Sequence, residues 1–420
     1  MHHFDYKDGQ FHCEDVPLAK IAEEVGTPFY CYSHATLLRH FTVFDQAFAE
    51  VPHLVCFAVK ANSNLAVVRL FAKAGGGADI VSGGELYRAQ RAGVPAEKIV
   101  YAGVGKTRAE IETALKAGIL MFNVESSQEL LLIDSVAGKL GVKAPVALRV
   151  NPDVDPQTHP YISTGLKQNK FGISIELALE EYRHASRLSN IEIVGMHKHI
   201  GSQITLVSPF ADALEKTLEL VAKLREEGIN IRYVDIGGGL GITYNDEAPP
   251  HPEELAKAIV PMLKETGCTI VFEPGRVLVG NAGALVTQTL FTKINADKTF
   301  IIVDAAMNDL ARPSLYGSYQ HIVPVLQEAV GRKKVSADVV GPICESGDFL
   351  AKDRVLPEFR LGELMAVMSA GAYGFTMSSN YNSRPRVPEV LVNGATYDVI
   401  RTRETMDDLV RGESIPAYLE

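Results

Sequence analysis

The sequence is poor in cysteine, and this narrows the possible chemistry. Its 420 residues include five cysteines, an odd number, and no two of them form a CxxC pair. A disulfide framework or a thiolate zinc site is therefore not expected. Four cysteines lie in apolar or strand-like stretches and are predicted to be inert core residues: Cys13, Cys31, Cys56 and Cys268.

Long apolar runs and clustered positive charge are also missing. No run of about 18 apolar residues occurs, and the N-terminal residues lack the apolar segment of a signal peptide. We therefore expect a soluble cytoplasmic protein with no membrane partner. The formal net charge is −10, and lysine and arginine do not gather into a stripe. Nucleic acid is therefore not an expected partner.

What remains is a globular composition, with short apolar strands that alternate with amphipathic helical patterns. Eight such strands are predicted, at 54–59, 78–81, 99–102, 121–124, 146–150, 193–199, 233–236 and 269–272. Parallel strands covered by helices have this pattern, and eight is the number in a (β/α)8 barrel. A doubly wound sheet is the alternative, but no GxGxxG follows the first strand, where such folds carry it.

The pattern changes near residue 280. Strands at 286–294, 300–303, 322–325, 337–340, 363–367 and 387–392 are separated by short turns, with few helices between them. We therefore predict an α/β protein with a TIM-like (β/α)8 barrel over 28–280. An antiparallel β domain would be formed by 1–27 together with 281–420.

Lys60 stands at the end of the first predicted barrel strand. The residues before it are apolar, and those after it are small and polar, as in a turn. Desolvation at the edge of a cavity lowers the pKa of an amine towards neutrality, which favours a nucleophile or a Schiff-base former. On this stretch alone, a strand-end lysine whose amine reaches water is the alternative.

Further polar residues stand at the predicted strand ends, which converge on one face of a barrel. They are Asp79, Asn123, Glu125, Arg149, Asn151, His197, His199 and Glu273. Glycines at 237–239 and at 275 follow the last two strands, where barrels bind phosphate through backbone N–H groups. A triple glycine is also compatible with a plain loop.

His197 and His199 permit two interpretations. Residues i and i+2 share a face of a strand, so the pair could bind a metal ion, as in a metal-dependent hydrolase. Alternatively, a histidine ring stacks against a planar cofactor, and Ser202 beside it offers a hydroxyl to a phosphate. A lysine, a phosphate cup, a ring platform and the Glu273 carboxylate together describe a pyridoxal phosphate site.

Three loops of the second predicted domain could present binding groups. Arg312 and Tyr316 place a cation and a phenol four residues apart, and Tyr373 lies between glycines. Cys344 precedes Glu345 in a turn-rich loop. Each of the three is also compatible with an ordinary surface feature.

Six motifs, in order along essentially the whole chain, resemble the diaminopimelate decarboxylases. These are pyridoxal phosphate enzymes of the alanine-racemase-like barrel class, related to ornithine and arginine decarboxylases. The motifs are FAVKAN at 57–62, HIGSQ at 199–203, DIGGG at 235–239, EPGR at 273–276, CESGD at 344–348 and GAYG at 371–374. The resemblance implies decarboxylation of meso-2,6-diaminopimelate to L-lysine and carbon dioxide, the last step of lysine biosynthesis, with pyridoxal 5'-phosphate as the cofactor.

The resemblance also implies roles for single residues. Lys60 would carry the cofactor, His199 would stack on its ring, and Glu273 would pair with its pyridine nitrogen. The remaining cofactor site would comprise Asp79, Ser202, Gly238, Gly239, Gly275, Arg276 and Tyr373. The substrate would contact Arg276, Arg312, Tyr316, Glu345 and Tyr373.

The resemblance implies that Cys344 is the proton donor and that its loop reaches the barrel of a second subunit. A homodimer with active sites at the subunit interface is therefore expected, acting on a small amino-acid substrate. No role follows for His197, and Lys198 is predicted to be a solvated or edge residue.

Three alternatives remain open. An ornithine, arginine or carboxynorspermidine decarboxylase would share the cofactor residues and differ in the pocket for the far end of the substrate. A non-catalytic pyridoxal phosphate-binding protein would keep Lys60 but would need neither Cys344 nor Arg312. The third alternative is the metal hydrolase. Bound metal would identify it, whereas a chromophore linked to a lysine would identify a pyridoxal phosphate protein.

Overall fold

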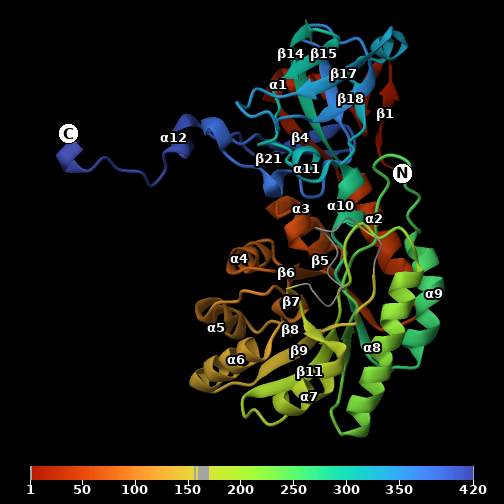
Figure 1. The fold of residues 1–420 in the computed structure, drawn as a ribbon, viewed down its shortest axis with the longest axis vertical. Coiled ribbons are helices and arrows are strands. Elements are labelled where there is room, and N and C mark those ends of the chain that lie inside the picture. Colours follow the sequence, from red (N-terminus) through yellow and green to blue (C-terminus); the bar gives the residue numbers. More distant parts are fainter. Residues whose placement is uncertain (1, 156–157, 159–169, 420) are drawn as a thin grey trace. The chain divides into compact units, whose positions relative to one another are not determined.

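The computed structural model describes residues 2–155, 158 and 170–419. It divides into two compact units, Leu38–Leu278 and the combination of Met1–Leu37 with Val279–Glu420 (Figure 1). No helix among the described residues is both long enough and apolar enough to cross a membrane.

The first unit is a closed barrel of eight parallel strands, as predicted. The strands are β5 (His53–Ala58), β6 (Gly77–Ile80), β7 (Ile99–Tyr101), β8 (Met121–Val124), β9 (Ala144–Asn151), β11 (Ile191–His197), β12 (Tyr233–Asp235) and β13 (Thr269–Phe272). Each pairs in parallel with the next, and β13 pairs with β5 to close the ring. A short strand, β10 (Ile173–Ser174), pairs with β9.

Helices cover the outside of the barrel. They are α2 (His34–Ala47), α3 (Leu65–Lys73), α4 (Gly83–Arg91), α5 (Arg108–Ala117), α6 (Ser127–Leu140), α7 (Ile175–Ala185), α8 (Ser208–Glu226) and α9 (Pro252–Lys264). Local sequence sets several ends: α5 begins with a capping box of Thr107 and Glu110 and ends at Gly118 in the left-handed conformation. The barrel interior is packed by Cys56, Val100, Met121, Ala147, Val194 and Val271.

The second unit is built on a sheet with the order β18-β17-β15-β14-β4-β20-β21. Its strands are β4 (Phe29–Ser33), β14 (Gly283–Asn295), β15 (Lys298–Val303), β17 (Lys334–Val340), β18 (Ala351–Pro357), β20 (Glu389–Asn393) and β21 (Thr396–Arg401). A branch of the sheet is formed by β19 (Leu364–Val367), which pairs with β14 and with β16 (Ile322–Pro324). Pairing is mainly antiparallel, but β15 with β17 and β4 with β20 are parallel.

The structure differs from the prediction at one boundary. The prediction assigned 28–280 to the barrel, whereas β4 pairs with β14 and β20 in the second unit. All five residues of β4 are buried. A short, fully buried strand has the same apolar pattern in either sheet, so the sequence does not reveal its pairing partner.

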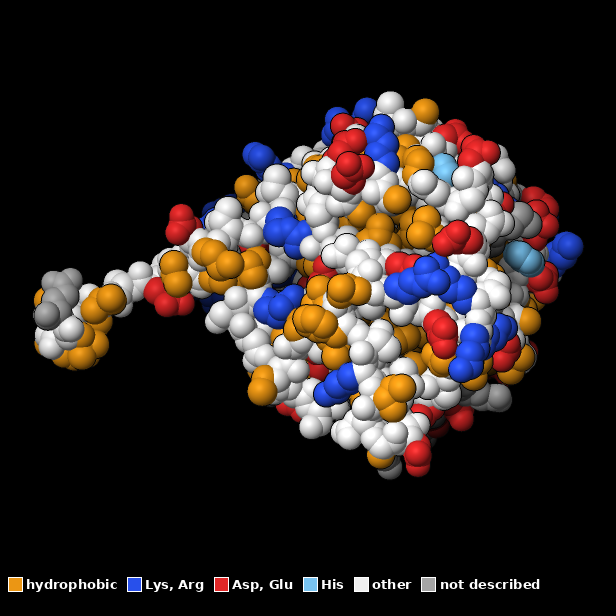
Figure 2. All heavy atoms as spheres, turned by 90° about the horizontal axis from the view of Figure 1, so that it is seen from above, with side chains coloured by type: hydrophobic (Ala, Val, Ile, Leu, Met, Phe, Trp, Pro, Cys, Tyr) orange, Lys and Arg blue, Asp and Glu red, His pale blue; other side chains and the backbone are white. Residues whose placement is uncertain are grey.

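The C-terminal segment of the second unit carries the short helix α12 (Met406–Leu409) and extends away from the strands of its unit (Figure 1). Its large apolar side chains are exposed: Met406, Val410, Ile415, Tyr418 and Leu419. On the face of the molecule that Figure 2 shows, basic side chains are interspersed with acidic ones.

Candidate active site

Lys60 lies just past the end of β5, in the short turn Val59–Ala61. Its Nζ donates to Oδ2 of Asp79 at 2.5 Å, and Asp79 is fully buried at the end region of β6. Burial and the negative charge of Glu273 raise the pKa of the Asp79 carboxyl to about 7, against the lowering effect of Lys60. The amine that the sequence singled out therefore stands beside a buried carboxyl at the mouth of the barrel.

His199 follows β11, and its ring is bound by the glycine loop after β12. The N–H of Gly238 donates to Nδ1 of His199 at 3.2 Å. With Nδ1 as acceptor, the neutral ring carries its hydrogen on Nε2. Burial and the positive charge of Arg149 lower the pKa of His199 well below its usual value, so the ring is neutral near pH 7. A neutral imidazole is suited to stacking on a flat ring.

The glycines of this loop are required by close packing. A Cβ on Gly238 would lie 2.2 Å from the carbonyl oxygen of Glu273, and one on Gly239 would lie 2.6 Å from that of Gly201. Gly239 has a φ of +120°, which L-residues with side chains rarely adopt. The loop therefore brings bare backbone to the end of the barrel, as a phosphate cradle needs.

Arg276 is held by two hydroxyls. Its Nη1 donates to the hydroxyl of Tyr244 at 2.6 Å, and its Nη2 donates to Oγ of Ser202 at 3.1 Å. The guanidinium is buried. The structure thus brings Arg276 and Ser202 together, as expected for two residues that share one anion. The sequence reading missed Tyr244, because nothing local marks it as a partner of Arg276.

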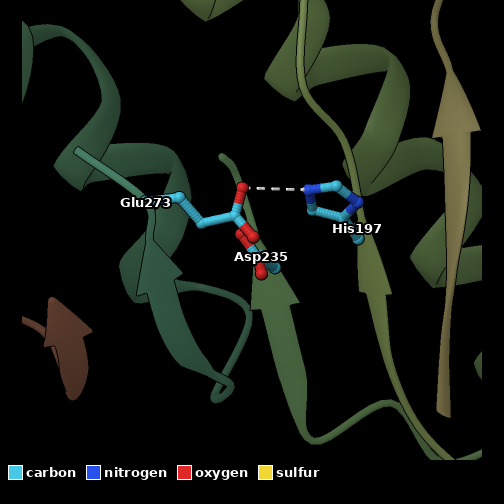
Figure 3. A group of neighbouring side chains, drawn as sticks. All are labelled: His197, Asp235 and Glu273. Atoms are coloured by element: carbon cyan, nitrogen blue, oxygen red, sulfur yellow. Dashed lines mark hydrogen bonds and ion pairs between the residues drawn. The ribbon is translucent and has the colours of Figure 1, made fainter. Parts of the chain in front are cut away.

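Glu273 belongs to a buried cluster at the ends of β8, β11, β12 and β13. Nε2 of His197 lies 3.3 Å from Oε2 of Glu273 (Figure 3). Nδ2 of Asn123 donates to Oε1 of Glu273 at 3.0 Å and to Oδ2 of Asp235 at 3.1 Å. Asn123 was predicted at a strand end, but the sequence did not assign it, Asp235 or His197 a function.

The two histidines do not act as a pair. His197, Asp235 and Glu273 offer atoms within 4.8 Å of one another and so form the one group among the described residues with the geometry for a metal ion. His199 is not in that group, and its Nδ1 accepts from the N–H of Gly238. The hydrogen bonds from Asn123 and His197 account for the arrangement of the two carboxyl groups.

Lys198 is not a solvated or edge residue, contrary to prediction. It is 1% exposed, and its Nζ lies 6.0 Å from the ring centroid of Phe210 in α8. Burial lowers the pKa of its amine to about 7, with the charge of Asp235 opposing this effect. The burial results from the helix that covers the outer face of the barrel, which local sequence does not show.

In the second unit, Arg312 begins the short helix α11 (Arg312–Tyr316). Its guanidinium carbon lies 5.4 Å from the ring centroid of Tyr316, one turn further along. Arg312 is buried. The cation and the phenol that lie four residues apart in the sequence therefore lie near each other in the structure. Tyr373 has a φ of +54°, and its neighbour Gly374 packs so closely that a Cβ would lie 2.4 Å from the carbonyl oxygen of Ala370.

Cys344 is the exposed cysteine, and the other four are buried, as predicted. Its backbone N–H donates to Oδ1 of Asn382 at 2.7 Å. The loop is fixed by Asp348, whose Oδ2 accepts from the N–H of Ile343 at 2.9 Å. Glu345, next to Cys344, is also exposed.

The residues of the barrel fit pyridoxal phosphate. The aldehyde of the cofactor requires an amine, which the structure places beside a buried carboxyl. The ring requires a flat neighbour such as the neutral imidazole, and the pyridine nitrogen requires a carboxylate such as the second buried one. The packed glycine loop and the buried Arg276 supply donors of the kind that a phosphate takes.

Comparison with known proteins agrees with this chemistry. Residues 34–280 match the family described as pyridoxal-dependent decarboxylase, pyridoxal binding domain. The chain is 54% identical over 409 residues to the diaminopimelate decarboxylase of Aquifex aeolicus, covering 97% of this chain and 96% of that protein. It is 52% identical to that of Vibrio cholerae, covering 99% of each.

A solved structure is similar over most of its length. The crystal structure of diaminopimelate decarboxylase from Helicobacter pylori complexed with L-lysine has a TM-score of 0.90 and 42% identity, covering 94% of this chain and 98% of that one. The likeness extends over both units. From the family match, the sequence identity and the shared fold, the chain belongs to the diaminopimelate decarboxylases, within the pyridoxal-dependent decarboxylases.

Proposed function

We propose that this chain decarboxylates meso-diaminopimelate to L-lysine and carbon dioxide, using pyridoxal 5'-phosphate held by the barrel. The observation that carries the choice of substrate is the buried guanidinium of Arg312 beside the phenol of Tyr316. Meso-diaminopimelate has a carboxylate at its far end, which ornithine and arginine lack. A guanidinium binds a carboxylate through two parallel hydrogen bonds.

In this proposal the barrel residues bind and orient the cofactor. Bound pyridoxal phosphate supplies a sink for the electron pair left when carbon dioxide departs. Lys60 would bind its aldehyde, and Asp79 accepts a hydrogen bond from the Lys60 amine. His199 would stack on the ring, and Glu273 would accept from the pyridine nitrogen. The phosphate would be bound by Ser202, Gly238, Gly239, Gly275, Arg276 and Tyr373.

Contacts with the far end of the substrate supply binding energy for the reaction. Arg312 and Tyr316 take its carboxylate, and Glu345 takes its ammonium group. The binding energy of these contacts holds the substrate in place. The α-carboxylate, which is lost as carbon dioxide, can then be kept in a poorly solvated position. Arg276 and Tyr373 also contact the substrate.

Cys344 is the proposed proton donor, a general acid that delivers a proton to the carbon from which carbon dioxide has left. The support is its exposed thiol on a loop fixed by Asp348 and Asn382. A thiol buried in the core has no access to a substrate, which separates Cys344 from the other four cysteines.

We propose further that the enzyme is a homodimer, in which the Cys344 loop of each subunit completes the barrel of the other. Exposed apolar side chains support this, since such groups mark protein contacts: Met406, Val410, Ile415, Tyr418 and Leu419. An exposed free thiol fits a reducing compartment, which supports a cytoplasmic location.

The test is a comparison of substrates. Purified protein with pyridoxal phosphate is incubated with meso-diaminopimelate, ornithine or arginine, and carbon dioxide and the amine products are measured. We expect carbon dioxide and L-lysine in equal amounts from meso-diaminopimelate and much slower turnover of the other two. Faster turnover of ornithine or arginine would show that the chain is an ornithine or arginine decarboxylase. No turnover of any of the three substrates would indicate a non-catalytic pyridoxal phosphate-binding protein.

A further inference from the structure

Two buried carboxyl groups lie next to each other inside the barrel. Glu273 comes at the end of β13 and Asp235 at the end of β12, and both are less than 5% exposed. Their carboxyl groups lie next to each other in Figure 3, and the ring of His197 faces the carboxyl group of Glu273. Both side chains are shielded from bulk solvent, so a charge there needs partners within the protein.

The amide of Asn123 holds the two carboxyl groups together. Its single Nδ2 carries two hydrogens, and it donates to Glu273 at 3.0 Å and to Asp235 at 3.1 Å. The other oxygen of Asp235, Oδ1, accepts from the N–H of Gly237 at 2.9 Å. The other oxygen of Glu273, Oε2, faces Nε2 of His197. Each carboxyl oxygen is therefore fixed by a neighbour.

The imidazole of His197 is neutral in this arrangement. Its Nδ1 is buried and has no hydrogen-bond partner among the residues that the structure describes. An imidazolium would bury an N–H there without an acceptor, which is unfavourable. Burial and the charge of Arg149 also lower the pKa of His197, although Glu273 opposes them. The neutral ring with hydrogen on Nε2 donates to Glu273.

Two adjacent buried carboxylates cannot both be ionised at low cost. Burial and the negative charge of Glu273 raise the pKa of Asp235 well above its usual value. Burial also opposes ionisation of Glu273, but the hydrogen bond from the neutral His197 ring and the positive charge of Lys60 favour its ionised form. The charged or titratable groups that face the cluster from the surrounding elements are Cys56, Lys60, Asp79, Glu125, Arg149, Lys198 and His199.

We infer that Asp235 is a positioning residue that keeps its proton in the working enzyme, and that His197 and Asn123 hold Glu273 as the single ionised carboxylate of the cluster. Both oxygens of Glu273 retain a lone pair for a further donor. Glu273 therefore presents one fixed negative charge to the pyridine nitrogen. This inference rests on the role proposed for Glu273. It places the one proton of the two acids on Asp235 and the negative charge on Glu273.

The protonated carboxyl is observable directly. Infrared spectroscopy of the holoenzyme at a pH of about 9, where ordinary carboxyl groups are fully ionised, should show the carbonyl band of a neutral carboxyl that shifts in heavy water. The band should be absent from Asp235→Asn. Asp309→Asn is the matched control and should keep the band, because burial raises the pKa of Asp309 only to about 7 and its carboxyl is ionised at pH 9. No band in the wild type, or a band unchanged in Asp235→Asn, would overturn the inference.

A second variant tests the part played by His197 and does not depend on the folding of Asp235→Asn. His197→Phe cannot donate to Glu273, so the affinity of the protein for pyridoxal phosphate should fall about tenfold, while His197→Gln, which can donate, should restore it. An unchanged affinity in His197→Phe would contradict the inference. The infrared band is read without turnover, so a wild type that prefers ornithine would refute the proposed substrate and leave this assignment intact.

Discussion

The hydroxyl of Ser314 donates to the carbonyl oxygen of Gly347 at 2.6 Å. Ser314 lies in α11, the helix that begins with Arg312, and Gly347 lies in the loop that carries Cys344. This hydrogen bond, with a longer one of 3.4 Å from the same hydroxyl to the carbonyl oxygen of Phe349, connects the proposed anchor of the substrate carboxylate with the loop of the proposed proton donor. Both groups must keep one geometry for the reaction, because small misplacements of reacting groups are costly.

Removing this connection should lower activity more than stability. We expect Ser314→Ala to reduce kcat/KM for meso-diaminopimelate about tenfold, while the free energy of unfolding falls by only about 0.5–1.5 kcal/mol, as for one hydrogen bond. Ser318→Ala is the matched control, because the Ser318 hydroxyl has no hydrogen-bond partner among the described residues. Equal kinetics in the two variants would show that the connection is not needed for catalysis.

Cys344→Ala should keep the cofactor and lose the proton donor. We expect kcat to fall by about 10²–10⁴, the usual loss for a general acid, with the visible absorbance of the bound cofactor unchanged. Because Cys344 is the exposed cysteine, a thiol-alkylating reagent should modify it first and inactivate the wild type in parallel. A fully active alkylated enzyme would remove Cys344 from this role.

Lys60→Ala should abolish turnover and the visible absorbance of the cofactor after dialysis. The fold should persist, because the Lys60 side chain is 35% exposed and lies at the barrel mouth, outside the packed interior. Lys73→Ala, an exposed lysine of α3, is the control and should behave as the wild type. A Lys60 variant that stays yellow through dialysis would show that another amine binds the cofactor.

Stability should depend on pH through Asp309. Burial raises its pKa to about 7 in the folded protein, against about 3.9 in the unfolded chain. The folded state therefore binds one more proton between these values, so stability falls as the pH rises from about 4 to about 7, by roughly 4 kcal/mol in total. Denaturant unfolding of Asp309→Asn should show a smaller fall than the wild type. An equal fall in both would contradict the assignment.

The fold was predictable from the sequence where the signal is local. Each of the eight barrel strands was placed within about two residues of its position, because a short apolar run followed by a helical pattern is a local property. The strands β18 and β21 were missed because exposed residues interrupt their apolar pattern.

The internal structure of the site was not predictable in the same way. Asn123 and Asp235 are 112 residues apart in sequence and meet only because the barrel closes. The burial of Lys198 follows from packing against α8, and the partnership of Tyr244 with Arg276 from the loop after the glycines. Strand ends indicate which residues converge, but contacts across the barrel set their protonation states.

The proposed substrate is tested most directly by the ratio of kcat/KM for meso-diaminopimelate to kcat/KM for ornithine, in the wild type and in Arg312→Ala. The loss of a buried guanidinium that binds a carboxylate costs about 2–5 kcal/mol, or roughly 30-fold to several thousand-fold. We predict a ratio far above one in the wild type that falls by this amount in the variant, with the value for ornithine little changed. A wild type that prefers ornithine, or equal losses on both substrates, would contradict the assignment.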